Sequence, residues 1–169
     1  MGEPQAQSQP AQVLVVGVAE MKLSNRSGDR VVTHALGSCI GIAIHDPRAC
    51  VGGILHYMLP LSEVNPAKAE RFPYMFADSG IPAFLRAAAE LGAQPQHVRV
   101  VMAGGAQLID SSDFFAIGKR NLTMARKLLW KSRLLVDKEH VGGTCSRTLT
   151  LEIGSGRTWL KVQGREIEL

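Results

Sequence analysis

Short apolar runs separated by turn-forming residues dominate the chain and predict about eight strands. Two segments differ, because their apolar residues recur at helical spacing, and these predict helices at 79–91 and about 119–132. Strands that alternate with helices and include several hairpins are typical of an α/β protein with a mixed β-sheet. The predicted strands lie at 12–18, 30–35, 40–44, 51–55, 98–102, 134–141, 148–153 and 158–162.

The runs at 40–44 and 51–55 predict a β-hairpin, since Asp46-Pro47-Arg48 between them has turn chemistry. The numbers of facing residues in an antiparallel hairpin add to a constant, about 95 or 96 for a turn centred near Arg48. We therefore expect Cys39 to face His56 or its neighbour, with Cβ atoms about 4.5–5.5 Å apart. This distance brings a thiol and an imidazole within reach of each other.

Cys39 and His56 are candidates for a nucleophile and its base. The thiolate is the reactive form of cysteine and a free thiol is mostly protonated near pH 7, so we expect His56 to take the proton. His45 is excluded as the base, because it lies six residues along the same strand from Cys39, about 20 Å away.

Three residues before the cysteine are candidates for supporting roles. Gly37 and Ser38 permit a tight bend that can aim backbone N–H groups at an oxyanion. The Thr33 hydroxyl is a candidate to orient the imidazole. A structural interpretation remains open at this point, because a cysteine in an apolar strand is often a small hydrophobe and a single histidine is often a core or surface residue.

The bulk composition indicates one globular domain. The chain has 169 residues, of which 46% are hydrophobic and 20% charged, enough for one well-packed core. Residues 1–11 are rich in Gln, Pro and Ala and predict a disordered segment, which leaves 12–169 as the domain. The net charge of +4 comes without a basic run interleaved with aromatics, so we expect no nucleic acid partner.

Several other classes of protein are disfavoured. Three cysteines are an odd number and show no metal-ligand spacing, so we expect no disulfide framework, no metal and a reducing, cytoplasmic setting. No apolar run approaches the roughly eighteen residues of a membrane span, and we expect no direct membrane insertion. A strand ends at Gly104-Gly105, but no phosphate-binding glycine motif follows, and we expect no nucleotide cofactor.

Five sequence blocks in a fixed order resemble the CheD family of chemoreceptor glutamine deamidases. The resemblance runs from about Val13 to Val162, nearly the whole chain. Each block alone is a weak signal, and their combination is specific. The blocks are 33–47, which ends in Asp46-Pro47; His56-Tyr57-Met58-Leu59-Pro60; Ala103-Gly104-Gly105-Ala106; Ile117-Gly118-Lys119-Arg120-Asn121; and Gly142-Gly143-Thr144-x-x-Arg147.

The resemblance implies both a fold and a reaction. It implies a single-domain layered α/β sandwich, with Cys39 as nucleophile, His56 as base and Thr33 completing the triad. The implied reaction is hydrolytic deamidation of specific glutamines to glutamate in methyl-accepting chemotaxis receptors, through a thioester and without a cofactor. The implied partners are the cytoplasmic helical region of those receptors and a CheC-type phosphatase.

Alternative functions remain. The chain could be a regulatory interaction module that binds receptors or a CheC-type phosphatase with little or no turnover. It could also be a cysteine protease or thioesterase. Arg147 has two interpretations, either binding a substrate carboxylate or pairing with Glu152 or a loop carbonyl, of which the structural one is favoured.

Overall fold

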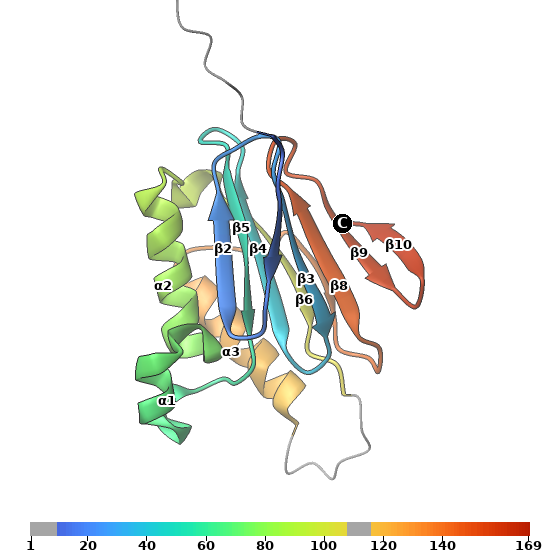
Figure 1. The fold of residues 1–169 in the computed structure, drawn as a ribbon. Coiled ribbons are helices and arrows are strands. Elements are labelled where there is room, and N and C mark those ends of the chain that lie inside the picture. Colours follow the sequence, from blue (N-terminus) through green and yellow to red (C-terminus); the bar gives the residue numbers. More distant parts are fainter. Residues whose placement is uncertain (1–9, 108–115) are drawn as a thin grey trace, which may run out of the picture.

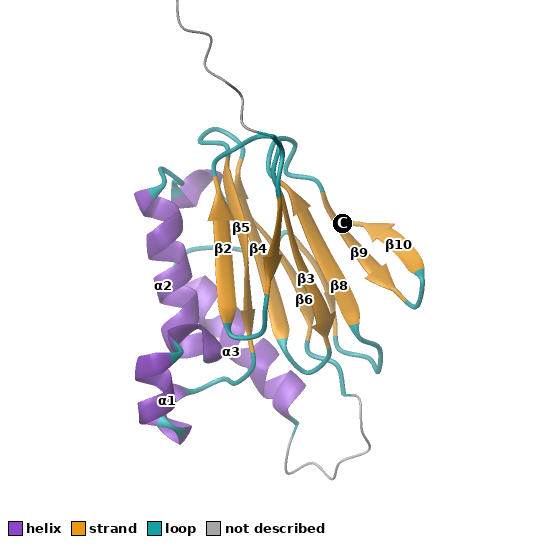
Figure 2. Cartoon of the chain, in the orientation of Figure 1, coloured by secondary structure: helices purple, strands orange, loops and turns teal. Residues whose placement is uncertain are grey.

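The fold has three layers: the helices, the sheet that they cover, and a second sheet that packs on the other face of the first (Figures 1 and 2). It comes from a computed structural model, which describes residues 10–107 and 116–169. The described residues contain ten strands in two five-stranded sheets. Most of the predicted disordered segment, residues 1–9, lies outside the described residues.

The sheet that the helices cover has the order β2-β5-β4-β6-β7. Its pairs are antiparallel except for β6 and β7, which run parallel, so the sheet is mixed. Its strands are β2 (Glu20–Ser24), β4 (Ile40–Asp46), β5 (Val51–Tyr57), β6 (Arg99–Gly104) and β7 (Lys138–Val141).

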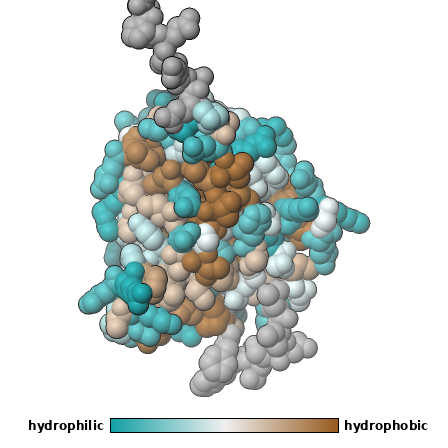
Figure 3. All heavy atoms as spheres, viewed as in Figure 1, coloured by the Kyte–Doolittle hydropathy of each residue, from teal (hydrophilic) through white to brown (hydrophobic). Residues whose placement is uncertain are grey.

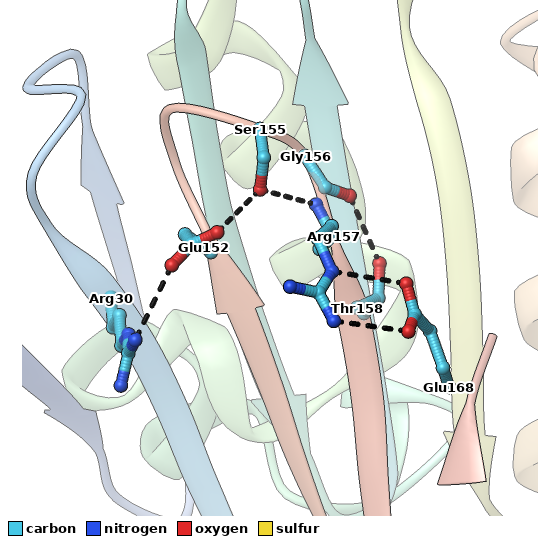
Figure 4. Close-up of polar contacts among 7 residues, drawn as sticks. All are labelled: Arg30, Glu152, Ser155, Gly156, Arg157, Thr158 and Glu168. Atoms are coloured by element: carbon cyan, nitrogen blue, oxygen red, sulfur yellow. Dashed lines mark hydrogen bonds and ion pairs between the residues drawn. The ribbon is translucent and has the colours of Figure 1, made fainter.

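The other sheet has the order β1-β3-β8-β9-β10 and is also mixed, because only β1 and β3 are parallel. Along its outer face, a row of polar contacts links β3, β8, the loop between β8 and β9, and β10 (Figure 4). Such exposed pairs each contribute little to stability. The strands are β1 (Val13–Val16), β3 (Arg30–Leu36), β8 (Arg147–Glu152), β9 (Thr158–Val162) and β10 (Arg165–Glu168).

The two main helices, α2 and α3, pack on the outer face of the β2-β5-β4-β6-β7 sheet (Figure 1). Their apolar faces meet that sheet through buried residues such as Phe84 and Leu129. The helices are α1 (Pro66–Arg71), α2 (Ala77–Glu90) and α3 (Ile117–Lys131), with 3-10 turns η1 (Ser62–Val64), η2 (Pro73–Met75) and η3 (Pro95–His97).

Strands β4 and β5 are buried on both faces, which explains why their sequences are almost continuously apolar. Ile42 and Leu55 point to the helices, whereas Ala43 and Ile54 point to the other sheet. The first strands of each sheet, β1 and β2, lie at neighbouring edges, and apolar surface gathers there (Figure 3). Val13 and Val15 of β1 are exposed at this edge.

The structure confirms the α/β class, the mixed pairing and the two main helices, and it divides the strands between two sheets. The strand predicted from Leu134 up to Gly142-Gly143 is confirmed only in its second half, as β7, because Leu134 packs into the core between helix and sheet while Leu135 is 78% exposed. Pairing with β6 begins after Asp137, whose carboxylate accepts a hydrogen bond from the Val100 N–H. The sequence pattern did not predict β2, α1 or β10.

Candidate active site

The register of the β4–β5 hairpin differs from the prediction. Gly41 pairs directly with His56, so facing residue numbers add to 97, and Cys39 does not stand opposite His56 or its neighbour. The reason is a four-residue loop, 47–50, closed by the pair Asp46–Val51. Cys39 lies two residues before Gly41 in the chain, on the face that packs against the other sheet. It is therefore a diagonal neighbour of His56, at a Cβ separation of about 7 Å.

Thr33 and His56 meet across the space between the two sheets. Thr33 belongs to β3 and His56 to β5, and both side chains are fully buried. The Thr33 hydroxyl lies 2.7 Å from His56 Nδ1 and 2.8 Å from the Val16 carbonyl oxygen. Because the one hydroxyl proton makes a hydrogen bond to the carbonyl, the hydroxyl oxygen accepts a hydrogen bond from Nδ1–H. The remaining imidazole nitrogen, Nε2, then carries a lone pair.

Burial keeps both members of the candidate pair neutral. It lowers the pKa of His56 to about 4 and raises the pKa of the Cys39 thiol. His56 Nε2 is buried and has no hydrogen-bond partner among the described residues, Cys39 included. The ionised thiol expected from the sequence is therefore not the resting state, because desolvation opposes both charges.

The loop that carries Cys39 begins at a bulge in β3. Pairing with β8 is irregular between Thr33 and Leu36, where Ala35 has φ +56°, and the Gly37 N–H donates to the Ala35 carbonyl. The backbone N–H of Cys39 partly offsets the rise in the pKa of the thiol. A backbone donor beside the candidate nucleophile is the geometry that an oxyanion site requires.

Asn121 is a residue of this region to which the sequence analysis assigned no role. Its side-chain Nδ2 donates to the Ser38 carbonyl at 3.0 Å and to the Met58 carbonyl at 2.7 Å. The only sequence signal for Asn121 is its place at the end of the block Ile117-Gly118-Lys119-Arg120-Asn121. Its hydrogen-bond partners could not be predicted, because they lie more than sixty residues away along the chain.

Arg147 has a structural role. Its buried guanidinium donates from Nε to His140 Nδ1 at 2.7 Å and from Nη1 to the Cys145 carbonyl at 3.1 Å, and Nη2 donates to the Gly142 carbonyl. These contacts confirm the interpretation of Arg147 as a partner of loop carbonyls. Burial lowers its pKa.

His45 lies away from the candidate site. His45 Nε2 lies 2.8 Å from the Ile153 carbonyl, at the opposite end of β4 from Cys39. Within residues 10–107 and 116–169, no three His, Cys, Asp or Glu side chains are grouped to hold a metal ion. None of the helices in this part of the chain is long and apolar enough to cross a membrane.

A cysteine on a tight loop, near a neutral imidazole that a hydroxyl orients, has the parts of a cysteine-dependent hydrolase on a layered α/β scaffold. A family model described as "CheD chemotactic sensory transduction" matches residues 58–162, more than half of the chain. The chain belongs to the CheD family.

Two relatives match nearly the full length of the chain. "Probable chemoreceptor glutamine deamidase CheD" of Solibacter usitatus is 48% identical over 156 residues, 92% of each chain. "Probable chemoreceptor glutamine deamidase CheD 1" of Syntrophus aciditrophicus is 47% identical over 151 residues, 89% of this chain and 94% of its own. A solved structure, Neisseria meningitidis protein NMB0706, is 10% identical with a TM-score of 0.46, over 80% of this chain and 63% of its own, too remote a likeness to bear on function.

Proposed function

We propose that this protein is a chemoreceptor glutamine deamidase, which hydrolyses the side-chain amide of specific glutamines in chemotaxis receptors to glutamate. Membership of the CheD family and the names of relatives that are 47% and 48% identical support this activity. The observation that carries the chemistry is the hydrogen bond between Thr33 and His56, which leaves Nε2 available as a base in the layer where Cys39 lies.

The first half-reaction forms a thioester. As the substrate amide enters, Cys39 turns toward His56, its proton passes to Nε2, and the sulfur attacks the carboxamide carbon. Backbone N–H groups at Ser38 and Cys39, with the bend at Gly37, stabilise the oxyanion. The C–N bond then breaks, and His56 gives its proton to the departing ammonia.

The second half-reaction restores the enzyme. His56 Nε2 takes a proton from water, and the resulting hydroxide attacks the thioester carbon. The C–S bond breaks, the sulfur regains its proton, and glutamate is released. Neither half-reaction requires a metal or an organic cofactor, and one neutral glutamine becomes an anion.

Peptide mass mapping of a receptor cytoplasmic fragment tests the proposal. Incubation with the wild-type protein is expected to convert discrete glutamines to glutamate and release ammonia, and Cys39→Ala and Cys39→Ser are expected to abolish both. Cys50→Ser and Cys145→Ser are the matched controls, because these free cysteines lie in loops, and both variants are expected to retain full conversion. Undiminished conversion by Cys39→Ala would refute the assignment.

The same assay separates the alternatives. Fragments of the receptor, in place of a glutamine-to-glutamate change, would indicate a protease. Tight binding of receptor or of a CheC-type phosphatase without any conversion would indicate an interaction module. We expect deamidation in the cytoplasm, on the helical region of the receptors, with a CheC-type phosphatase as a competing partner.

A further inference from the structure

One buried amide ties together the two segments that carry the proposed nucleophile and base. Asn121 lies in the first turns of α3 and is fully buried. Its Nδ2 donates to the carbonyls of Ser38, directly before Cys39, and of Met58, two residues after His56. The side chain thus spans the nucleophile loop, which we define as residues 37–39, and the end of β5.

All three carbonyls of the nucleophile loop accept hydrogen bonds from other segments of the chain. The Gly37 carbonyl accepts from the Ala106 N–H at 2.8 Å, and the Cys39 carbonyl accepts from the Gly105 N–H at 2.9 Å. The Ser38 carbonyl between them is the one that accepts from Asn121. Asn121 therefore completes a row of three donors along the loop.

The orientation of the Ser38 carbonyl decides where the Cys39 N–H points. The two groups belong to one planar trans peptide unit, in which C=O and N–H point in opposite directions. By holding the carbonyl, Asn121 fixes the direction of the Cys39 N–H, which points away from that carbonyl. That N–H is the proposed oxyanion donor.

Close packing of α3 allows the amide to reach the loop. A Cβ added at Gly118 would lie 2.6 Å from the Gly105 carbonyl oxygen, so only glycine permits this approach. The Tyr57 hydroxyl donates to the backbone carbonyl of Asn121 at 2.7 Å and anchors the helix to β5 independently of the side chain. The backbone contact of Asn121 with Tyr57 can therefore be perturbed separately from its side-chain contacts with the two carbonyls.

The Asn121 amide is only half satisfied. Its two carbonyl acceptors require the NH2 group to face them, which settles the orientation of the amide. The oxygen, Oδ1, is then buried without a hydrogen-bond partner among the described residues.

We infer that Asn121 is a positioning residue for the deamidase reaction: its side-chain donors orient the Ser38–Cys39 peptide and join the nucleophile loop to the strand of His56. The inference rests on the proposed function. Asn121 touches no substrate atom and acts through the backbone of the loop.

Steady-state deamidation of a receptor fragment by Asn121→Asp tests this role. The carboxylate cannot donate and repels both carbonyls, so kcat is expected to fall about tenfold or more, with KM within about twofold of wild type. A protonated carboxyl regains one donor, so the ratio of mutant to wild-type kcat is expected to rise as the pH falls from 8 to 5. Alkylation of Cys39 by iodoacetamide needs no oxyanion donor and is expected to keep its rate.

Tyr57→Phe is the matched control, because it removes an equally buried hydrogen bond to Asn121 but leaves both side-chain donors in place. It is expected to lower the melting temperature and keep kcat within about twofold of wild type. If Asn121→Asp does not fold, Asn121→Ser takes its place, with the same expected loss of kcat at an unchanged alkylation rate.

Three results would overturn the inference: an unchanged kcat in the Asn121 variants, an equal loss of kcat in Tyr57→Phe, or faster alkylation of Cys39 that parallels the loss of kcat. The last would indicate a loosened loop. Wild-type protein and Cys39→Ala run in the same assay, and equal activity of those two would refute the proposed function itself. A difference between them, with none for Asn121→Asp, would refute the role of Asn121 alone.

Discussion

The Thr33 hydroxyl decides which nitrogen of His56 carries the proton. It donates a hydrogen bond to the Val16 carbonyl, so it can only accept a hydrogen bond from Nδ1–H. Without this acceptor the imidazole could hold its proton on Nε2, the nitrogen that the proposed mechanism needs unprotonated. A neutral hydroxyl is sufficient for this task because His56 is already kept neutral by burial.

Thr33→Val tests the tautomer argument. Valine has nearly the same shape but no hydroxyl, so Nδ1–H loses its acceptor, and we expect kcat to fall by about tenfold with little change in KM. Ammonia release measured over a range of receptor concentrations separates the two constants. Thr33→Ser keeps the hydroxyl and is expected to retain most activity; equal losses in both variants would point to packing as the cause.

The lowered pKa of His56 predicts a loss of stability in mild acid. Below its ordinary pKa of 6.5 the unfolded chain protonates this imidazole, whereas the native protein keeps it neutral down to about pH 4. The free energy of unfolding is thus expected to fall by about 2–3 kcal/mol between pH 7 and pH 4.5 from this group. Urea unfolding of wild type and His56→Gln isolates it, since the variant should lack that part of the pH dependence.

At the scale of elements, α3 and the loop after β6 form the support behind the nucleophile loop. Gly104 has φ +111°, and a Cβ there would collide with the Cys39 carbonyl oxygen. Gly105 donates to that same oxygen, and Gly118 lets the helix approach. The glycines of two separate blocks therefore serve one purpose, close contact of three segments.

Gly118→Ala is expected to push α3 away from the loop. The new Cβ meets backbone atoms on a neighbouring segment, which cannot yield as a flexible side chain would, so we expect about 1–3 kcal/mol of destabilisation. Deamidase activity should fall as well, because Asn121 moves with the helix. Thr123→Ala, at an exposed site on the same helix, is the control for urea unfolding and activity, and a neutral Gly118→Ala would show that the helix has room to shift.

The sequence predicted which segments form elements better than where they begin and meet. The β4–β5 hairpin followed from two β-branched runs around a turn, but loops of two to five residues fit that pattern, and the four-residue loop shifted the register. Helix α1 was missed although Asn65 and Pro66 are a usual start signal, since the segment is only six residues long. The role of Asn121 could not be predicted, because it depends on contacts between distant segments.

At the scale of the whole molecule, the candidate site lies between the two sheets. Thr33 comes from one sheet, His56 from the other, and Cys39 from the loop that joins them. The distance between the sheets is set by the core that they share, which includes Leu149. The geometry of the site therefore depends on residues that contact none of its members.

Leu149→Ala tests the dependence on sheet spacing. Leu149 is fully buried between the sheets, so its truncation is expected to cost about 2–5 kcal/mol and to lower activity at temperatures where the variant remains folded. Leu129→Ala makes a similar cavity between α3 and its sheet and is the matched control, with a comparable loss of stability and a smaller loss of activity. Equal activity losses would contradict the argument. Urea unfolding and ammonia release measure the two effects.

The bond between Thr33 and His56 also has a consequence for the newly made polypeptide. The acceptor that sets the histidine tautomer exists only once both sheets have come together, since neither carries the pair alone. A nascent or half-assembled chain would thus present an ordinary, unactivated thiol to the crowded interior of the cell. On the proposed mechanism, the Cys39 thiol gains its base only when the two sheets have assembled, which protects other amide-bearing proteins from indiscriminate attack.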